Sequence, residues 1–178
     1  MLREESHPAN HGGAESMKET VTHLPFPVHR LMFVCHGNIC RSPMAEIVMA
    51  DLLHKAGRDD VVTASSATST EEIGNGIHPG TCRLLRLHGI PLRQHTAVQL
   101  NRRDADKYDL FLGMDSANLR NMGRILGTAA EGRIFSLLDF SDTPRDISDP
   151  WYTGDFETTF ADIMEGCEAL LKVIHIQG

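Results

Sequence analysis

The sequence predicts an α/β fold: a single domain with a four-stranded, parallel, twisted sheet and helices on both faces, in a flavodoxin-like three-layer arrangement. Short apolar runs alternate with segments of helical period along the chain, which is typical of βαβ units and a parallel sheet. Some of these runs are continuously apolar, as in strands that are buried on both faces. The chain has 178 residues, which is enough for one domain with a full core and short for two.

The first half of the fold begins with an apolar strand and a helix. "HRLMFV" (29–34) is predicted to form the first strand because it is short and continuously apolar. A helix is predicted to open at Ser42 and Pro43, where serine suits the cap and proline the first turn, and to end at Gly57. The segments that follow are a second strand, "DVVTAS" (60–65), and a turn-rich loop (65–80).

The second half continues the alternation. Its elements are a helix over 81–90, a strand over 108–114, a helix from 116 capped by Asp115, a strand over 132–138 and a polar loop over 139–155. A final helix begins at Phe156 with Asp155 as its cap. Its apolar stripe at helical spacing comprises Phe156, Phe160, Ile163, Met164, Cys167, Leu170, Leu171 and Ile174.

Composition and charge narrow the class of protein. Apolar residues make up 41% and charged residues 23%, as in ordinary globular proteins. The net charge of −7 argues against a nucleic-acid surface or an anionic membrane as the main partner. No stretch approaches the roughly 18 consecutive apolar residues needed to span a bilayer. We therefore expect neither nucleic-acid nor membrane partners, and a chain that works as a monomer.

The N-terminal segment and the cysteines bear on where in the cell the protein works. Residues 1–28 are polar and without period, so we expect a disordered extension ahead of a domain over 29–178. That segment lacks the apolar core of an export signal. Four dispersed cysteines do not make a disulfide scaffold. The default is a reducing cytoplasm, with export by a signal-less route left open.

The segment "VCHGNICRSP" (34–43) is the candidate catalytic loop. It lies between the first strand and the first helix, a position where anions bind. Backbone N–H groups of such a turn, with those of the helix start, form an anion-binding nest. Gly37 lets the backbone bend, and Asn38 tolerates a left-handed conformation. Arg41 offers a planar fork for two phosphate oxygens. The same donors favour the thiolate of Cys35, which would then be a nucleophile.

The string "VCHGNICRSPMAE" resembles the active-site signature of the low-molecular-weight protein tyrosine phosphatases. The resemblance extends over nearly the whole chain after residue 29. Further blocks in the family's order are "SSATS" (65–69), "EIGN" (72–75), "HGIP" (88–91), "MDSANLR" (114–120) and "DPWYTGDFETTF" (149–160). It implies hydrolysis of phosphotyrosine in proteins, and of small aryl phosphates, with release of inorganic phosphate and with no metal or cofactor.

The resemblance also implies catalytic roles. Cys35 would attack phosphorus and carry a phosphocysteine, and Arg41 would bind the phosphate and stabilise the transition state. Asp149, in an Asp-Pro-aromatic pattern, would be the general acid and then the base. From the residues alone, Asp139, Asp142 and Asp146 are equal rivals for that role.

The remaining site residues follow from the resemblance as three groups. The phosphate-binding loop comprises His36, Gly37, Asn38, Ile39, Cys40, Arg41 and Ser42. The network that would support the loop comprises Asn38, Ser42, Ser65, His88 and Asp115. The substrate rim comprises His36, Ile39, Glu71, Trp151 and Tyr152, of which His36 and Glu71 depart from the apolar or aromatic residues that are common in the family.

Two cysteines of the loop raise a redox question. Cys40 matches a second loop cysteine of the family, and its thiol could form a reversible disulfide with Cys35 or be a buried spectator. Cys82 and Cys167 lie on apolar helical faces and are expected to pack.

Four alternatives remain to be weighed. An arsenate reductase on the same scaffold needs a relay of cysteines, and no partner closely follows Cys82. A protein arginine phosphatase is expected to carry a smaller polar residue in place of Ile39. A binding module for phosphotyrosine would not need both Cys35 and Asp149. A metal site is disfavoured because Cys35 and Cys40 lack paired-ligand spacing and no second pair follows.

Overall fold

The apolar run at the start of the domain forms strand β1 (Arg30–Cys35), the second strand of a four-stranded sheet in the computed structural model, which describes residues 17–177. The other strands are β2 (Val62–Ala67), β3 (Leu110–Gly113) and β4 (Ile134–Ser136). Their order is β2-β1-β3-β4, and every neighbouring pair is parallel. The strand order therefore reverses next to β1, which is where ligands bind in such sheets.

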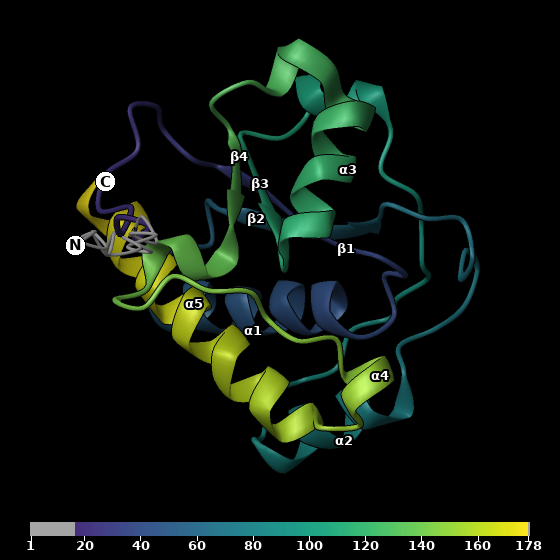
Figure 1. Cartoon of the computed structure of the whole chain (residues 1–178). Helices are drawn as coiled ribbons and strands as arrows, with labels where there is room; N and C mark the ends of the chain where they lie inside the picture. The colour runs from purple at the N-terminus through teal and green to yellow at the C-terminus, as the bar shows by residue number, and fades with distance from the viewer. Residues whose placement is uncertain (1–16, 178) are drawn as a thin grey trace, which may run out of the picture.

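Helices cover both faces of the sheet, so the predicted three-layer α/β fold is confirmed (Figure 1). The helices α1 (Arg41–Lys55), α2 (Pro79–Leu87) and α5 (Phe156–Ile176) lie on one side, and α3 (Ser116–Leu126) lies on the other. The short elements are η1 (Arg102–Asp106), η2 (Gly127–Ala130), η3 (Leu137–Phe140) and α4 (Pro150–Thr153).

Strand β1 supplies side chains to both layers of the core. Leu31 and Phe33 belong to the large apolar cluster beneath α1 and α5, whereas Met32 and Val34 belong to the smaller cluster with Met122 of α3. Alternate side chains of a strand point to opposite faces, so a strand between two helical layers must be apolar at every position. This is the reason for the continuous apolar run.

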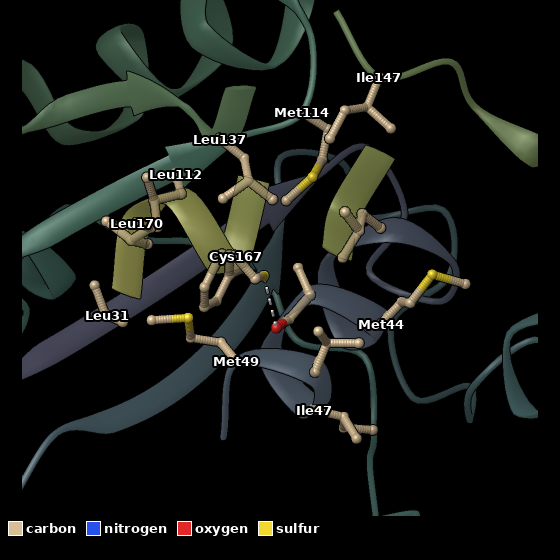
Figure 2. Packing of buried hydrophobic residues seen from close by; sticks show 14 of the residues in the cluster. Leu31, Met44, Ile47, Met49, Leu112, Met114, Leu137, Ile147, Cys167 and Leu170 are labelled. Atoms are coloured by element: carbon tan, nitrogen blue, oxygen red, sulfur yellow. Dashed lines mark hydrogen bonds between the residues drawn. The ribbon is translucent and has the colours of Figure 1, made fainter. Parts of the chain in front are cut away.

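Helix α5 closes the larger layer against α1. Asp155 caps it as predicted, its Oδ1 accepting the N–H of Thr158 at 3.0 Å. Figure 2 shows Cys167 and Leu170 of α5 among Leu31, Leu112 and other buried side chains. The Cys167 thiol donates to the carbonyl of Ala45 in α1 at 3.8 Å. Cys167 is therefore a packing residue, as expected.

Several element boundaries differ from the predicted ones. β2 begins two residues later than expected and includes two serines. It pairs with β1 along its whole length, from Val62 opposite Arg30 to Ala67 opposite Cys35. α2 begins at Pro79, with the side chain of His78 as its cap. The predicted loop 139–155 contains the last residues of η3 and the one-turn helix α4. The fourth strand is cut short because η3 begins directly after Ser136.

The segment 17–28 packs against the domain, in contrast to the expected disorder over 1–28. Leu24 and Val28 are buried in the large apolar cluster. Gln177 donates its side-chain amide to the carbonyls of Leu24 and Phe26, at 2.8 and 3.1 Å. The apolar residues dispersed in this segment carry no period, so the pattern did not reveal the contact. The rest of the predicted extension, 1–16, lies outside the described residues.

Candidate active site

The loop between β1 and α1 wraps around the sulfur of Cys35. The backbone N–H groups of Asn38 and Ser42 donate to Cys35 Sγ at 3.3 and 3.4 Å. The Ser42 hydroxyl lies 3.0 Å from the same sulfur. Donors from the middle and the end of the loop therefore converge on one sulfur atom, which faces the cavity.

Asn38 fixes the shape of the loop. Among the described residues it is the one non-glycine residue with a positive φ, 58°, as expected for asparagine in a left-handed turn. Its side chain is buried and donates to the hydroxyls of Ser42 and Ser65, at 2.8 and 2.9 Å. Its Oδ1 accepts the N–H of Val98 at 3.1 Å. A side chain with every polar group satisfied can maintain backbone strain of this kind.

The Ser42 hydroxyl contacts the Cys35 sulfur and does not cap helix α1. The cap residue of α1 is Cys40, whose side chain makes no capping bond, so the predicted serine cap is wrong. Because Ser42 lies inside the helix, its hydroxyl is free to reach Cys35 and the amide of Asn38. The carbonyl of Cys40 accepts from the Thr81 hydroxyl at 3.1 Å, which ties α2 to the loop.

Arg41 is 2% exposed and lies between two carboxylates. Its Nη1 donates to Asp115 Oδ2 at 2.7 Å and to the carbonyl of Ile147 at 2.8 Å, and its Nη2 lies 3.3 Å from Asp149 Oδ2. Burial alone would lower the pKa of Arg41, but the negative charges of Cys35, Asp115 and Asp149 outweigh it and raise that pKa. The guanidinium is therefore a fixed cation in the floor of the site.

Asp115 links this cation to the fold. Its Oδ1 accepts the N–H of Asn118 at 2.8 Å as the cap of α3, as predicted, while Oδ2 accepts from Arg41. Because Asp115 follows β3 closely, its carboxylate lies at the same sheet edge as Cys35 at the end of β1. One carboxylate thus performs both roles that were considered from the sequence.

Asp149 lies at the same edge and caps α4, its Oδ1 accepting the N–H of Trp151 at 3.1 Å. Its rivals lie elsewhere. Asp139 is buried, accepts the N–H of Ser136 at 2.9 Å and pairs with Lys18. Asp146 accepts from the Ser116 hydroxyl at 3.1 Å, and Asp142 does not line the cavity around Cys35. Asp149 alone of these four faces the sulfur's cavity.

The supporting network includes a histidine, but it is His95 and not His88. His95 Nε2 donates to the carbonyl of Asn38 at 2.7 Å, so that nitrogen carries a proton. The predicted His88 instead stacks on Phe160 of α5, with ring centroids 4.0 Å apart. His95 lies in a segment without helix or strand pattern, and nothing in its local sequence marks it as a loop contact.

Glu46 extends this network from α1. It accepts the Ser65 hydroxyl at 2.5 Å, and its carboxylate lies 4.0 Å from the His95 ring. Sequence reasoning did not single it out. Its position one helical turn after Ser42 on the first helix is the signal that would have indicated it.

The cavity above the sulfur has a volume of about 90 Å³. Its lining residues are Cys35, His36, Gly37, Ile39, Cys40, Arg41, Glu71, Glu72, Asp149, Trp151 and Tyr152. All five expected rim residues are among them, and Glu72 was not foreseen. Trp151 is 56% exposed and packs edge-on against His78, with ring centroids 5.8 Å apart. An aromatic wall therefore stands beside Asp149.

Two further observations concern thiols and metals. Burial, reinforced by the neighbouring Cys35, raises the pKa of the Cys40 thiol to about 12, so Cys40 is a poor nucleophile at neutral pH. Cys82 does not line the cavity and Cys167 lies in the core, so neither can relay electrons from Cys35 in this arrangement. Within residues 17–177, no three histidine, cysteine or acidic side chains are grouped to bind a metal ion.

Fold and site together define a class: a doubly wound α/β protein with a cysteine-based phosphate-binding loop at the strand switch point, in a Cys-x5-Arg arrangement. Residues 30–177 match the family model described as low molecular weight phosphotyrosine protein phosphatase. The chain belongs to this family, and it is an enzyme of the protein-tyrosine-phosphatase kind. The resemblance noted from the sequence is confirmed.

Relatives support the assignment over most of their length. The low molecular weight protein-tyrosine-phosphatase YfkJ of Bacillus subtilis is 40% identical over 147 residues, covering 81% of this chain and 94% of the relative. A phosphotyrosine phosphatase of Drosophila melanogaster is 33% identical, covering 82% and 96%. The crystal structure of YfkJ superposes with a TM-score of 0.81 at 36% identity, covering 86% of this chain and 98% of that one. None of the helices in the described part of this chain is long and apolar enough to cross a membrane.

Proposed function

We propose that this phosphatase hydrolyses phosphotyrosine in proteins, and small aryl phosphates, through a phosphocysteine on Cys35. The observation that carries the proposal is the convergence of two backbone N–H groups on Cys35 Sγ, in a cavity that Arg41 and Asp149 also line. A sulfur surrounded by donors, beside a buried cation, is suited to attack a dianion. The same donors can bind the equatorial oxygens of the phosphoryl group.

The first step forms the S–P bond between Cys35 and phosphorus while the bond from phosphorus to the phenol oxygen breaks. Asp149, as the carboxylic acid, gives its proton to that oxygen, so the product is a neutral phenol. Arg41 and the loop N–H groups stabilise the charge that the three equatorial oxygens bear in the transition state.

The second step returns the enzyme to its starting state. A water molecule attacks phosphorus, and the Asp149 carboxylate accepts its proton. The S–P bond breaks with its electrons on sulfur, which restores the thiolate and releases inorganic phosphate. Trp151 and Tyr152 would pack on the substrate ring, and Ile39 would form the apolar side of the loop.

Rival activities fit the site less well. An arsenate reductase needs a relay of further cysteines after the first, and the candidate for it, Cys82, does not line the cavity. Ile39 gives the loop an apolar side where an arginine phosphatase is expected to carry a smaller polar residue. The predicted cytoplasmic location, the monomeric state, and the absence of nucleic-acid and membrane partners stay predictions, as does a regulatory Cys35–Cys40 disulfide.

The test is turnover of p-nitrophenyl phosphate and phenyl phosphate with a chelator present. Cys35→Ser should abolish hydrolysis of both. Asp149→Ala should slow phenyl phosphate by about 10²–10⁴-fold and p-nitrophenyl phosphate less, since p-nitrophenolate leaves without a proton. Asp146→Ala is the matched control and should retain wild-type rates. Substantial activity in Cys35→Ser would refute the mechanism.

A further inference from the structure

Two consecutive carboxylates, Glu71 and Glu72, stand at the mouth of the cavity that contains the Cys35 sulfur. Glu71 Oε2 lies 3.0 Å from His36 Nε2. Glu72 accepts from the Asn75 amide at 2.6 Å, and a Cβ placed on Gly37 would lie 3.3 Å from its Cγ. The stem of Glu72 thus packs on the phosphate-binding loop, and neighbours position both carboxylates.

The mouth is negative overall. Among the described lining residues Arg41 is the one lysine or arginine, and it is buried between Asp115 and Asp149. The His36 ring pairs with Glu71 and not with Glu72. Glu72 pairs with the amide of Asn75, which is neutral and does not cancel its charge. A net charge of −7 on the chain reinforces this local field toward an approaching peptide.

The floor of the same cavity has the opposite character. Arg41 Nε is buried and finds no hydrogen-bond partner among residues 17–177, although the other guanidinium nitrogens do. This free donor, with the loop N–H groups, points to an anionic ligand at the floor. Charge therefore changes sign along the depth of the cavity, from donors below to carboxylates at the rim.

We infer that Glu71 and Glu72 make the enzyme prefer phosphotyrosines that have lysine or arginine as neighbours in the peptide. The inference rests on the proposed function and specifies its substrate class. With the phosphate at the floor and the ring against Trp151, the adjacent peptide residues lie at the rim. A cationic neighbour gains an ion pair there, whereas an acidic neighbour meets two carboxylates.

The test compares kcat/KM for three phosphotyrosine peptides that differ only in the residues on either side of the phosphotyrosine: lysine, alanine or glutamate. The wild type should favour the lysine peptide over the glutamate peptide by about ten-fold at low salt. Raising the salt to about 0.5 M should reduce the ratio, because these pairs are exposed and screened. Each rate is compared with that of the same enzyme on p-nitrophenyl phosphate, which has no peptide neighbours.

Glu71→Gln/Glu72→Gln should reduce the ratio to within about two-fold, since the amides retain size but not charge. The matched control is Glu131→Gln, which removes an exposed carboxylate just ahead of β4, at the opposite end of the strands, and should retain the wild-type ratio. A wild-type ratio near one, or an unchanged ratio in the double variant, overturns the inference alone. No hydrolysis of p-nitrophenyl phosphate by the wild type would instead refute the proposed function, and the inference with it.

Discussion

Arg41 shows at the scale of one residue how the fold produces a phosphate site. A buried guanidinium is costly unless oxygens surround it, and here three oxygens come from two segments: Asp115 after β3, and Ile147 and Asp149 in the loop ahead of α4. Ile147 is itself fixed, because its N–H donates to the carbonyl of Met114 at 2.8 Å. The fork is therefore oriented before substrate binds, which lowers the cost of organising charge in the transition state.

His95 allows a test of loop support at this scale. Replacing it with alanine leaves the carbonyl of Asn38 without its donor. Loss of one such bond should lower kcat on p-nitrophenyl phosphate by about 2–10-fold, and His95→Gln should recover part of the loss. Steady-state kinetics on the purified variants measures both effects.

His88→Ala is the comparison for that experiment. It removes a ring stacked on Phe160, so we expect a lower midpoint of urea unfolding with an unchanged kcat. If His88→Ala lowered kcat as much as His95→Ala, the placement of the two histidines would be contradicted.

Some residues could be identified from the sequence because their chemistry depends on local order. Cys35, Asn38 and Arg41 lie on one short loop between a strand and a helix, so their convergence follows from spacing alone. His95 and Glu46 meet only through the fold, since one lies in the irregular segment after α2 and the other lies on α1. Contacts of that kind leave no pattern in a single sequence, and the resemblance indicates His88 for the network where the structure has His95.

At the scale of elements and segments, the packed part of the chain begins before residue 29, because segment 17–28 contacts the domain. It joins η3 through the N–H of Val21, which donates to the carbonyl of Asp139 at 2.7 Å. It joins the end of α5 through Gln177. The family match begins only at residue 30, so this segment makes its contacts from outside the matched region. Because its composition is that of a polar tail, the sequence does not indicate that Leu24 and Val28 are buried.

Leu24→Ala tests whether this segment stabilises the domain. Leu24 is 1% exposed, so its truncation should lower the free energy of unfolding by about 2–4 kcal/mol. The segment lies away from the lining of the cavity, so kcat/KM on p-nitrophenyl phosphate should not change. Urea denaturation followed by circular dichroism measures the stability.

Met17→Ala is the control at the exposed start of the same segment. Met17 is 90% exposed, and its truncation should alter the free energy of unfolding by no more than about 0.5 kcal/mol. Equal stability of Leu24→Ala and wild type would show that the segment does not pack in solution.

For the whole molecule, the buried thiol of Cys40 couples stability to alkaline pH. Its pKa is raised from 9.0 to about 12, chiefly by burial. Below pH 9 the thiol is protonated in both states and its full contribution is present. As pH rises from 9 toward about 12 the unfolded chain releases a proton that the folded chain retains, so stability is lost over that window.

The free energy of unfolding should therefore decline with a slope of up to about 1.4 kcal/mol per pH unit from this group in that window. Cys40→Ala should remove that share of the slope, while the two proteins should run parallel between pH 6 and 8. Urea unfolding at a series of pH values measures both curves. Parallel curves above pH 9 would rule out the coupling.

Helix α5 runs from the aromatic wall of the active site to the N-terminal segment 17–28. Its first residue, Phe156, stacks with His78 beside the aromatic wall, while Gln177 at its far end bonds to Leu24. Its 21 residues span about 30 Å at 1.5 Å each. A tether or reporter domain joined after Gln177 would thus sit far from the mouth, and an immobilised enzyme would keep its entrance open to large phosphoproteins.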